Sequence, residues 1–352
     1  MARNNKDRSL NVLAIRFSAI GDVAMTVPVL SSVCRAYPQH KFTMLTNSRF
    51  EAFFQSMPDN FCFMGVDLYK DYKGSEGLKR LVELLKSMNF DMVADLHGVI
   101  RTHTITMKLR LAGCRTATIR KGRIARWALT RQHLKRQRPL KLSIEKYQSV
   151  LERLGFDFCV DFSAGAGNAP ELLGQVEEKL GQKGQNAWVG IAPFAAHKGK
   201  IYPLELMEKV VADLDSRSGV RMFIFAYGKE KEQIADWPEK YESVVLVGGM
   251  FNMHQEMALM SQLDVMLSMD SSNMHIASLC GTRVVSVWGA THPNAGFLGV
   301  GQKVQDCVQL PLACRPCSIY GKKACRFGDY RCLSGIAPEA ILKTIGPLKD
   351  KD

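Results

Sequence analysis

Residues 263–293, LDVMLSMDSSNMHIASLCGTRVVSVWGATHP, constrain the fold of this chain more than any other stretch. Apolar residues alternate up to Met269, and Asp270, Ser271 and Ser272 follow, which are residue types found at helix N-caps. A helical run then ends at Gly281, and a second apolar run, residues 283–288, comes directly after it. This order predicts a strand, a helix and a second, parallel strand, the βαβ unit of a parallel sheet.

The helix of this unit begins at the carboxyl end of the strand before it. Its first N–H groups and the positive end of its dipole favour an anion at that place, and the hydroxyls of Ser271 and Ser272 add further donors. These features favour a phosphate-binding site. The alternative is an ordinary capped helix without a ligand.

The same alternation runs through the rest of the chain and predicts α/β architecture with doubly wound parallel sheets. Because 352 residues are too many for a single core, we expect two Rossmann-like domains. They are residues 1–165, with a basic arm over 101–146, and residues 186–335, followed by a C-terminal helix and tail over 336–352; residues 163–170 read as a linker. Strands are predicted over 11–17, 41–46, 91–96, 187–193, 220–225 and 244–247, and helices over 29–37, 76–88, 145–154 and 204–216.

Charged residues follow several of these strands, where open α/β sheets place their reactive groups. Asp22 is expected in a loop after the first strand, and His97 follows the strand over 91–96. In the second domain, Lys198 and Lys200 follow the strand over 187–193. A loop carboxylate is often only a turn former, and exposed lysines and histidines are often only solvated, so each residue alone is a weak indicator.

The formal net charge of +13 comes from one segment, because residues 101–146 contain fourteen Lys or Arg and a single acid, Glu145. Such a run is either a solvated face or a surface for an anionic partner. Nucleic acid, an anionic membrane surface, and a phosphorylated and carboxylated acceptor all fit. The chain has no zinc-finger spacing and no RNP-type aromatic motif, so nucleic acid is the weakest of the three.

Further patterns exclude other classes of protein. The chain contains neither G-x-G-x-x-G nor a P-loop, which argues against a dehydrogenase and an NTPase. No apolar run reaches 18 residues and no signal-peptide pattern opens the chain, so we expect a cytoplasmic protein with reduced cysteines. Structural zinc and reduced thiols that pack a loop are alternatives for the four cysteines near the C-terminus, Cys314, Cys317, Cys325 and Cys332.

Several of these motifs together resemble those of glycosyltransferase family 9, the lipopolysaccharide heptosyltransferases, which have the GT-B fold. The resemblance rests on IRFSAIGDVAMTVPVL near the N-terminus, DLHG at 95–98, KIYP at 200–203, MDSSNMHIASLCGTRVVSVWGATHP, and the cysteine-rich CRPCSIYGKKACRFGDYRCLSGIAPEAI. It covers nearly the whole chain. It implies a metal-independent transfer of heptose, with inversion and without a cofactor, from an ADP-heptose donor to the inner core of lipopolysaccharide.

The resemblance also implies roles for individual residues. Asp22 matches the aspartate that acts as general base, and Lys200 matches the lysine that contacts the donor phosphate, although Tyr202 replaces the usual Trp. Ser272 stands where the family normally has Gly, so a side chain narrows the approach to the phosphate. The implied donor-binding residues are Asp270, Ser271, Ser272, His275, Glu230 and Met250.

The basic arm then fits an anionic core glycolipid at the inner membrane surface, with peripheral contact between protein and membrane. His97, Arg101, Arg120 and Arg123 are the candidate acceptor-binding residues. A related family 9 transferase with another nucleotide sugar or acceptor is one alternative function. A non-catalytic protein that binds anions through the basic arm is another.

Overall fold

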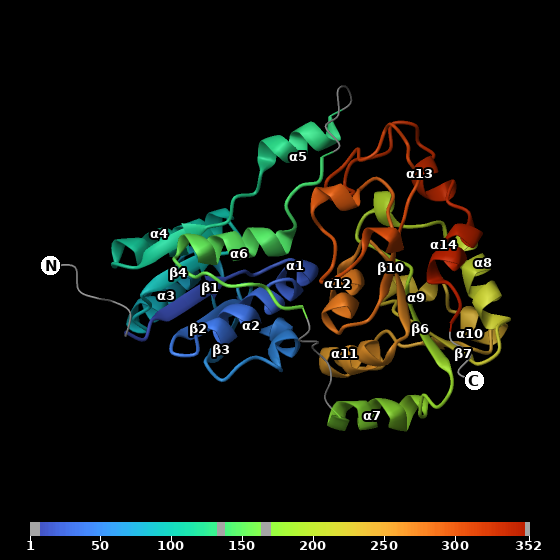
Figure 1. Cartoon of the computed structure of the whole chain (residues 1–352), viewed down its shortest axis with the longest axis horizontal. Helices are drawn as coiled ribbons and strands as arrows, with labels where there is room; N and C mark the ends of the chain where they lie inside the picture. Colours follow the sequence, from blue (N-terminus) through green and yellow to red (C-terminus); the bar gives the residue numbers. More distant parts are fainter. Residues whose placement is uncertain (1–7, 132–137, 163–169, 349–352) are drawn as a thin grey trace. The chain divides into compact units, whose positions relative to one another are not determined.

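The computed structural model describes residues 8–131, 138–162 and 170–348. The chain forms two compact units, which are drawn with their elements in Figure 1. Unit 1 consists of residues 1–121 and 143–164, and unit 2 of residues 122–142 and 165–352. The basic arm is therefore divided between the units, because residues 101–121 and 143–146 belong to unit 1 and residues 122–142 to unit 2.

Unit 1 contains a parallel sheet with the strand order β3-β2-β1-β4-β5. Helices α3 and α4 cover one face of it, where they pack on Leu13, Ile15 and Val93. Helices α2 and α6 contact β2 and β4 on the other face. The bounds are β1 Asn11–Ile15, α1 Ile20–Ala24, α2 Val27–Ala36, β2 Lys41–Asn47, the 3-10 helix η2 Ser48–Phe54, β3 Phe61–Val66, α3 Gly74–Ser87, β4 Met92–Asp95, α4 Ile100–Leu111, β5 Arg115–Thr118 and α6 Ser143–Arg153.

Unit 2 contains a second parallel sheet, with the order β11-β10-β9-β6-β7-β8. Figure 1 shows α8 and α14 on one side of this sheet and α11 and α12 on the other. The strands are β6 Ala187–Ala192, β7 Val220–Ile224, β8 Val244–Leu246, β9 Val265–Met269, β10 Val284–Val287 and β11 Cys307–Val308. The helices are α5 Arg123–Thr130, α7 Pro170–Leu180, α8 Leu204–Asp215, α9 Lys229–Glu232, α10 Trp237–Lys240, α11 Met253–Gln262, α12 Ser272–Leu279, α13 Arg331–Ser334 and α14 Pro338–Ile345, with the 3-10 turns η3 Lys198–Lys200, η4 Pro293–Ala295 and η5 Val304–Asp306.

The central strands could be predicted from the sequence because their residues are buried on both faces and are therefore almost all apolar. All six residues of β6, AWVGIA, are buried, as expected for a strand whose two faces are both covered by helices. Gly190 is required within it, because a Cβ there would lie 2.5 Å from Leu263 Cδ1 and from Met266 Sδ. The βαβ unit predicted from residues 263–293 is β9, α12 and β10, with Val284 paired to Met266 in parallel register.

The predicted α/β class with two parallel sheets is confirmed. Strands β3, β5 and β11 were not predicted: β3 alternates poorly, and the other two are only four and two residues long. The expected loop at Asp22 is wrong, because this residue lies in α1, a helix of five residues that is too short to show a helical period. The predicted linker lies outside the described residues, except for Pro170, which begins α7.

Both sheets have the same switch point. In each, the first strand of the unit lies between the second and the fourth, so the connections leave in opposite directions on its two sides. Open α/β sheets bind ligands at this point, outside the carboxyl ends of the two adjacent strands. The switch point lies between β1 and β4 in unit 1, and between β6 and β9 in unit 2.

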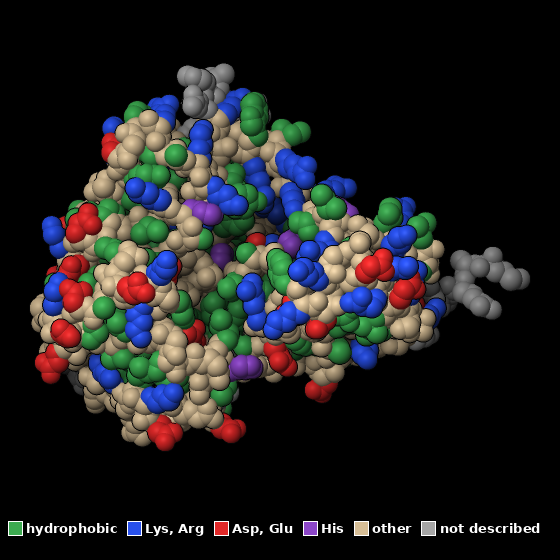
Figure 2. Space-filling model, turned by 180° about the vertical axis from the view of Figure 1, so that it is seen from behind, with side chains coloured by type: hydrophobic (Ala, Val, Ile, Leu, Met, Phe, Trp, Pro, Cys, Tyr) green, Lys and Arg blue, Asp and Glu red, His purple; other side chains and the backbone are tan. Residues whose placement is uncertain are grey.

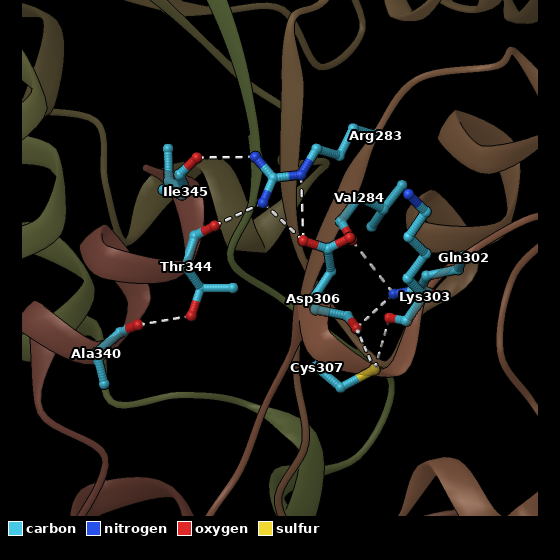
Figure 3. A network of polar contacts seen from close by, with 10 residues as sticks. Arg283, Val284, Gln302, Lys303, Asp306, Cys307, Ala340, Thr344 and Ile345 are labelled. Atoms are coloured by element: carbon cyan, nitrogen blue, oxygen red, sulfur yellow. Dashed lines mark hydrogen bonds and ion pairs between the residues drawn. The ribbon is translucent and has the colours of Figure 1, made fainter. Parts of the chain in front are cut away.

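Arg283 ties the start of β10 to the end of the chain, as Figure 3 shows. Its guanidinium contacts Asp306 Oδ1 at 2.6 Å and donates to the carbonyl oxygens of Thr344 at 2.6 Å and Ile345 at 2.8 Å. Those carbonyls lie in the last turn of α14, where a positive charge also interacts favourably with the helix dipole. Arg283 therefore stabilises the docking of α14 on the sheet of unit 2.

Candidate active site

The switch point of unit 1 holds Asp22, which α1 presents just beyond β1. Its Oδ2 lies 2.5 Å from the guanidinium of Arg16, the residue that follows β1. Arg16 is itself fixed, because it donates to the carbonyl of Leu96 at 2.6 Å and stacks over the ring of Tyr147. The side chain of Asp22 keeps 28% of its surface exposed and that of Arg16 only 9%. The carboxylate is therefore the accessible member of the pair.

His97 lies on the neighbouring strand end, just beyond β4. Its Nδ1 accepts a long hydrogen bond from the Phe17 N–H at 3.4 Å, and its Nε2 lies 3.5 Å from Ser18 Oγ. Burial, and then the charges of Arg16, Lys121 and Arg101, lower the pKa of His97 to about 4, although Asp22 acts in the opposite direction. The ring is thus neutral at pH 7, and Nδ1 as acceptor places its proton on Nε2.

The switch point of unit 2 holds Lys200 and Asp270. Lys200 follows β6 in the η3 turn, and Asp270 follows β9. Lys200 Nζ lies 2.8 Å from Asp270 Oδ2 and 3.0 Å from the carbonyl oxygen of the same residue. Here the carboxylate is nearly buried, with 4% of its side chain exposed, while Lys200 keeps 16%. The cation is the accessible member of this pair.

Helix α12 begins beside this pair. Ser271 is its N-cap in extended conformation, but within the described structure its hydroxyl does not cap the helix and lies 3.2 Å from Ser268 Oγ. The first N–H groups of the helix are therefore not occupied by that side chain. Ser272 opens the helix half-buried, and His275 lies one turn later and is 7% exposed. The predicted donor-binding residues Asp270, Ser271, Ser272 and His275 are thus brought together.

Glu230 and Met250 lie at two other strand ends of unit 2. Glu230 is in α9, after β7, and its Oε2 accepts from the Tyr227 N–H at 3.3 Å. Met250 follows β8 and is 37% exposed, and its carbonyl accepts from Lys179 Nζ at 3.3 Å. Both are carboxyl-edge positions, but no contact joins either residue to Lys200 or Asp270 in the described part of the chain.

Two groups of this region were missed from the sequence. Glu256 is 4% exposed and accepts from the Tyr227 hydroxyl at 2.8 Å, and burial raises its pKa to about 7 although that bond acts in the opposite direction. Arg315 is 2% exposed and donates to the carbonyls of Trp288 at 2.9 Å and Thr291 at 3.0 Å. It thus holds the loop after β10 in place. Glu256 lies outside the quoted motifs and Arg315 lies within the cysteine-rich one, but in both cases only the unusual burial of a charged group identifies the residue.

The segment after Arg315 also shapes the position of Lys200. Gly321 has φ +76°, and a Cβ on it would lie 2.7 Å from Lys200 Cγ. The aliphatic part of Lys200 therefore passes directly over this glycine. Lys198 has different surroundings, since its Nζ lies 5.5 Å from the centroid of the Tyr330 ring. Tyr202, which replaces the family's Trp, is fully buried and donates to the Ile336 carbonyl at 2.7 Å.

The candidate acceptor residues do not form a single group. Arg101 is close enough to His97 to lower its pKa. Arg120 instead lies near Arg153, whose pKa is lowered by burial and then by Arg120. Arg123 is the first residue of α5 and belongs to unit 2, whereas His97, Arg101 and Arg120 belong to unit 1.

All ten cysteines carry free thiols. Burial raises the pKa of the Cys325 thiol, but the backbone N–H groups of Phe327, Tyr330 and Gly328 together lower it below its ordinary value. Across the described ranges, no three or more His, Cys, Asp or Glu side chains are placed to hold a metal ion. No helix of those ranges is long and apolar enough to cross a membrane.

Curated proteins with similar sequences include lipopolysaccharide heptosyltransferase 3 of Escherichia coli, which is 24% identical over 283 residues covering 77% of this chain and 81% of that protein. The protein of the same name from Escherichia coli strain K12 is 25% identical over 288 residues, covering 77% of this chain and 80% of the relative.

Solved structures show the same fold. A family 9 glycosyl transferase from Veillonella parvula DSM 2008 superposes with a TM-score of 0.74 at 18% identity, covering 95% of this chain and 96% of that one. The E. coli heptosyltransferase WaaC with ADP-2-deoxy-2-fluoro heptose superposes with a TM-score of 0.66 at 19% identity, covering 96% and 99%. The model of glycosyltransferase family 9 (heptosyltransferase) matches residues 78–330. On that match, which spans most of the sequence, the chain belongs to glycosyltransferase family 9, the heptosyltransferases, as its motifs predicted.

Proposed function

We propose that this protein transfers heptose from ADP-heptose, with inversion, to an anionic glycolipid of the lipopolysaccharide inner core. The observation that carries the proposal is the Lys200–Asp270 pair at the start of α12, at the switch point of unit 2. The names of the E. coli relatives and the sugar nucleotide bound to WaaC support this choice of donor and acceptor.

The donor half of the proposal rests on unit 2. A leaving diphosphate gains negative charge as the glycosidic bond breaks, and a cation or a helix N-terminus held in advance stabilises that charge. Lys200 supplies the cation, and α12 supplies the N–H groups. Asp270 orients Lys200 through two contacts of its own, at 2.8 and 3.0 Å. No metal is required in this scheme, because the protein provides the positive charge.

Glu230 and Met250 complete the proposed donor site. We assign Glu230 to the ribose and Met250 to the adenine, since each lies after a strand of the same sheet. Ser271, Ser272 and His275 are assigned to the pyrophosphate and the donor sugar. Ser272 carries a side chain where the family normally has glycine, which narrows the approach to the phosphate.

The acceptor half rests on unit 1. Asp22 is assigned as the base that removes the proton of the acceptor hydroxyl, and Arg16 fixes its carboxylate in one orientation. His97 is neutral at pH 7, so its Nε2–H serves as a hydrogen-bond donor to the acceptor rather than as a charge. Arg101, Arg120 and Arg123 are assigned to phosphate and carboxylate groups of the glycolipid, which brings the protein into peripheral contact with the membrane.

The test is an incubation of the purified protein with ADP-heptose and a glycolipid that lacks the accepting heptose. We expect release of ADP together with a mass increase of one heptose residue in the glycolipid. Parallel incubations with UDP-glucose and GDP-mannose test the donor. Transfer from one of these instead of ADP-heptose would reassign the donor, and binding of the glycolipid without transfer from any donor would make the protein a non-catalytic binder.

A further inference from the structure

Helix α5, Arg123–Thr130, carries two exposed apolar side chains that have no role in the proposed transfer. Ile124 is 83% exposed and Trp127 is 62% exposed, one helical turn apart on the same face. The other three tryptophans, Trp188, Trp237 and Trp288, are at most 2% exposed. A large aromatic side chain in water is a considerable cost to solubility, so this exposed pair indicates a surface that is covered by something else.

The helix itself is firmly held in unit 2. Leu129 is fully buried. Arg126 donates to the Tyr320 hydroxyl at 2.7 Å, and its guanidinium lies 5.5 Å from the centroid of the Phe297 ring. The Leu140 N–H donates to the Asn294 carbonyl at 2.9 Å and fixes the returning chain. Ile124 and Trp127 are therefore exposed although the helix that carries them is fixed by contacts with unit 2.

The apolar surface continues beyond the two exposed side chains. A groove of about 770 Å³ lies beside α5 and is lined by Ile124, Ala125, Ala128 and Leu140, together with Gly122, Arg123 and Arg138. The lining is thus aliphatic with two arginines. Together with Trp127, it gives α5 an apolar side bordered by positive charge.

Positive charge surrounds this apolar side. Within unit 2, Arg123 and Arg131 lie on or next to α5, and the half-exposed Tyr320 is followed by the exposed Lys322 and Lys323. Arg131 also lies 5.4 Å from the centroid of the Trp127 ring. Figure 2 shows that blue basic and green apolar side chains lie next to one another on the face of the molecule that it draws. Residues 122–142 contain no acid at all.

A short helix with Trp and Ile on one side and Arg around it has the composition of an element that lies in a membrane interface. We propose that α5 docks this protein on an anionic lipid bilayer, with Ile124 and Trp127 inserted at the boundary between headgroups and acyl chains. The apolar groove adds area that the acyl chains cover, and the arginines bind lipid phosphates. Charge complementarity favours this occupant over a second copy of the same basic chain, because two such faces would repel.

This inference deepens the proposed function and rests on it for the presence of a lipid-linked acceptor, but its test needs neither donor nor acceptor. The full-length protein is mixed with vesicles of phosphatidylcholine alone or with phosphatidylglycerol added. Because Trp127 is the exposed member of the four tryptophans, its emission should shift to shorter wavelength on the anionic vesicles and be quenched by brominated acyl chains. Trp127→Phe should abolish the shift while the protein still co-sediments with the vesicles.

The double variant Ile124→Ser/Trp127→Ser should bind anionic vesicles about tenfold or more weakly, because two apolar side chains are removed from the interface. Val304→Ser is the matched control, since Val304 is 60% exposed elsewhere in unit 2 and should leave binding unchanged. With a water-soluble, deacylated acceptor, the double variant should keep wild-type ADP release, which separates this inference from the proposed transfer.

Three results would overturn the proposal. One is equal binding of the double variant and the wild type. Another is binding that does not depend on the anionic lipid. The third is lipid-free dimerisation of the wild type that the double variant loses, which would assign the face to a second copy of the chain.

Discussion

The two switch points share a topology but expose opposite members of an ion pair. In unit 1, Arg16 is the buried partner and Asp22 the accessible one, with 9% and 28% of their side chains exposed. In unit 2, Asp270 is the buried partner and Lys200 the accessible one, with 4% and 16% exposed. The accessible group is thus a carboxylate in unit 1 and an ammonium group in unit 2.

The strand order that the two units share determines where each ion pair lies. The burial of one partner determines which charged group remains accessible to a ligand. A carboxylate whose cationic partner is buried still has an exposed oxygen that can accept a proton from a hydroxyl group. An ammonium group whose carboxylate partner is buried remains exposed and can bind an anion. The same sheet order can therefore carry a base in one unit and a diphosphate site in the other.

The largest expected effect comes from removing the accessible cation. Lys200→Ala should lower turnover by about 10²–10³-fold with a smaller loss of ADP affinity, because the diphosphate gains charge in the transition state. Steady-state kinetics and ADP binding by calorimetry measure the two effects. Lys198→Ala should be nearly silent, since Lys198 faces the Tyr330 ring.

The buried partner sharpens this test. Lys200→Ala leaves the nearly buried carboxylate of Asp270 without its ammonium group, so that carboxylate repels the diphosphate. Adding Asp270→Asn should therefore restore part of the ADP affinity but not the turnover. If Lys198→Ala and Lys200→Ala proved equivalent, the diphosphate site would lie elsewhere in the molecule.

Removing the accessible carboxylate should have the next largest effect. Asp22→Asn should lower turnover by roughly 10²-fold while donor affinity is unchanged, because an amide cannot accept the acceptor's proton. The measurement is single-turnover transfer at saturating donor together with ADP binding. Asp59→Asn, at an exposed position of the same unit, is the control.

Loss of folding must be kept apart from loss of the base, since Asp22→Asn also weakens the pairing of the buried Arg16. Thermal unfolding of the variant reports the structural part. A variant that is folded and binds donor but retains full turnover would remove Asp22 from its assigned role.

The two units also differ in the pH at which their buried titratable groups change charge, and this affects stability. His97 in unit 1, with a pKa of about 4, does not titrate near neutrality, whereas Glu256 in unit 2, with a pKa of about 7, does. Because the folded-state pKa of Glu256 is raised from 4.5, its contribution to stability is fully present below pH 4.5 and is lost as the pH rises through about 7. Glu256→Gln should therefore gain roughly 1–3 kcal/mol relative to wild type between pH 5 and pH 8.

Thermal unfolding across this pH range measures the gain. His97→Asn is the contrasting variant: the folded-state pKa of His97 is lowered, so its contribution is present above pH 6.5 and is lost as the pH falls through about 4. It should leave the slope above pH 7 unchanged. A steep slope that persists in Glu256→Gln would mean that another group titrates.

Local sequence was sufficient for the strands with strong apolar patterns, but not for β3, β5 and β11. Asp270 follows a strongly patterned strand, whereas Lys200 was separated from Lys198 only by the resemblance of KIYP to the family motif. The parallel pairing of β6 and β9 places the two strand ends side by side. Partners from distant segments were not identified. Arg16 contacts the Leu96 carbonyl, eighty residues further along the chain. Arg315, within the cysteine-rich motif, donates to four carbonyl groups. Arg283 joins the start of β10 to α14 across about sixty residues of chain.

The division of the basic arm between the two units could not be predicted from the sequence, because it depends on contacts with residues far away along the chain. Its charge is continuous along the chain, so composition marks a single segment. Residues 122–142 belong to unit 2. The hydrogen bonds of Arg126 to Tyr320 and of the Leu140 N–H to the Asn294 carbonyl hold them there, and both partners lie more than 150 residues further along the chain. Charge density along a sequence therefore indicates a binding surface without indicating which unit carries it.

Removal of divalent metal ions should have no effect on turnover. This experiment tests whether Lys200 and the start of α12 are sufficient to stabilise the leaving diphosphate. Many transferases neutralise a departing diphosphate with a bound divalent ion, which a chelator removes. If Lys200 and the first N–H groups of α12 supply that charge, turnover of the wild type should be unchanged by EDTA, since neither is lost on chelation. Activity lost in EDTA and restored by Mg²⁺ would contradict this. The same titration on Lys200→Ala sharpens the result: added Mg²⁺ should recover part of its turnover if the missing ammonium group acted only through its charge, and none if Lys200 also positions the phosphate.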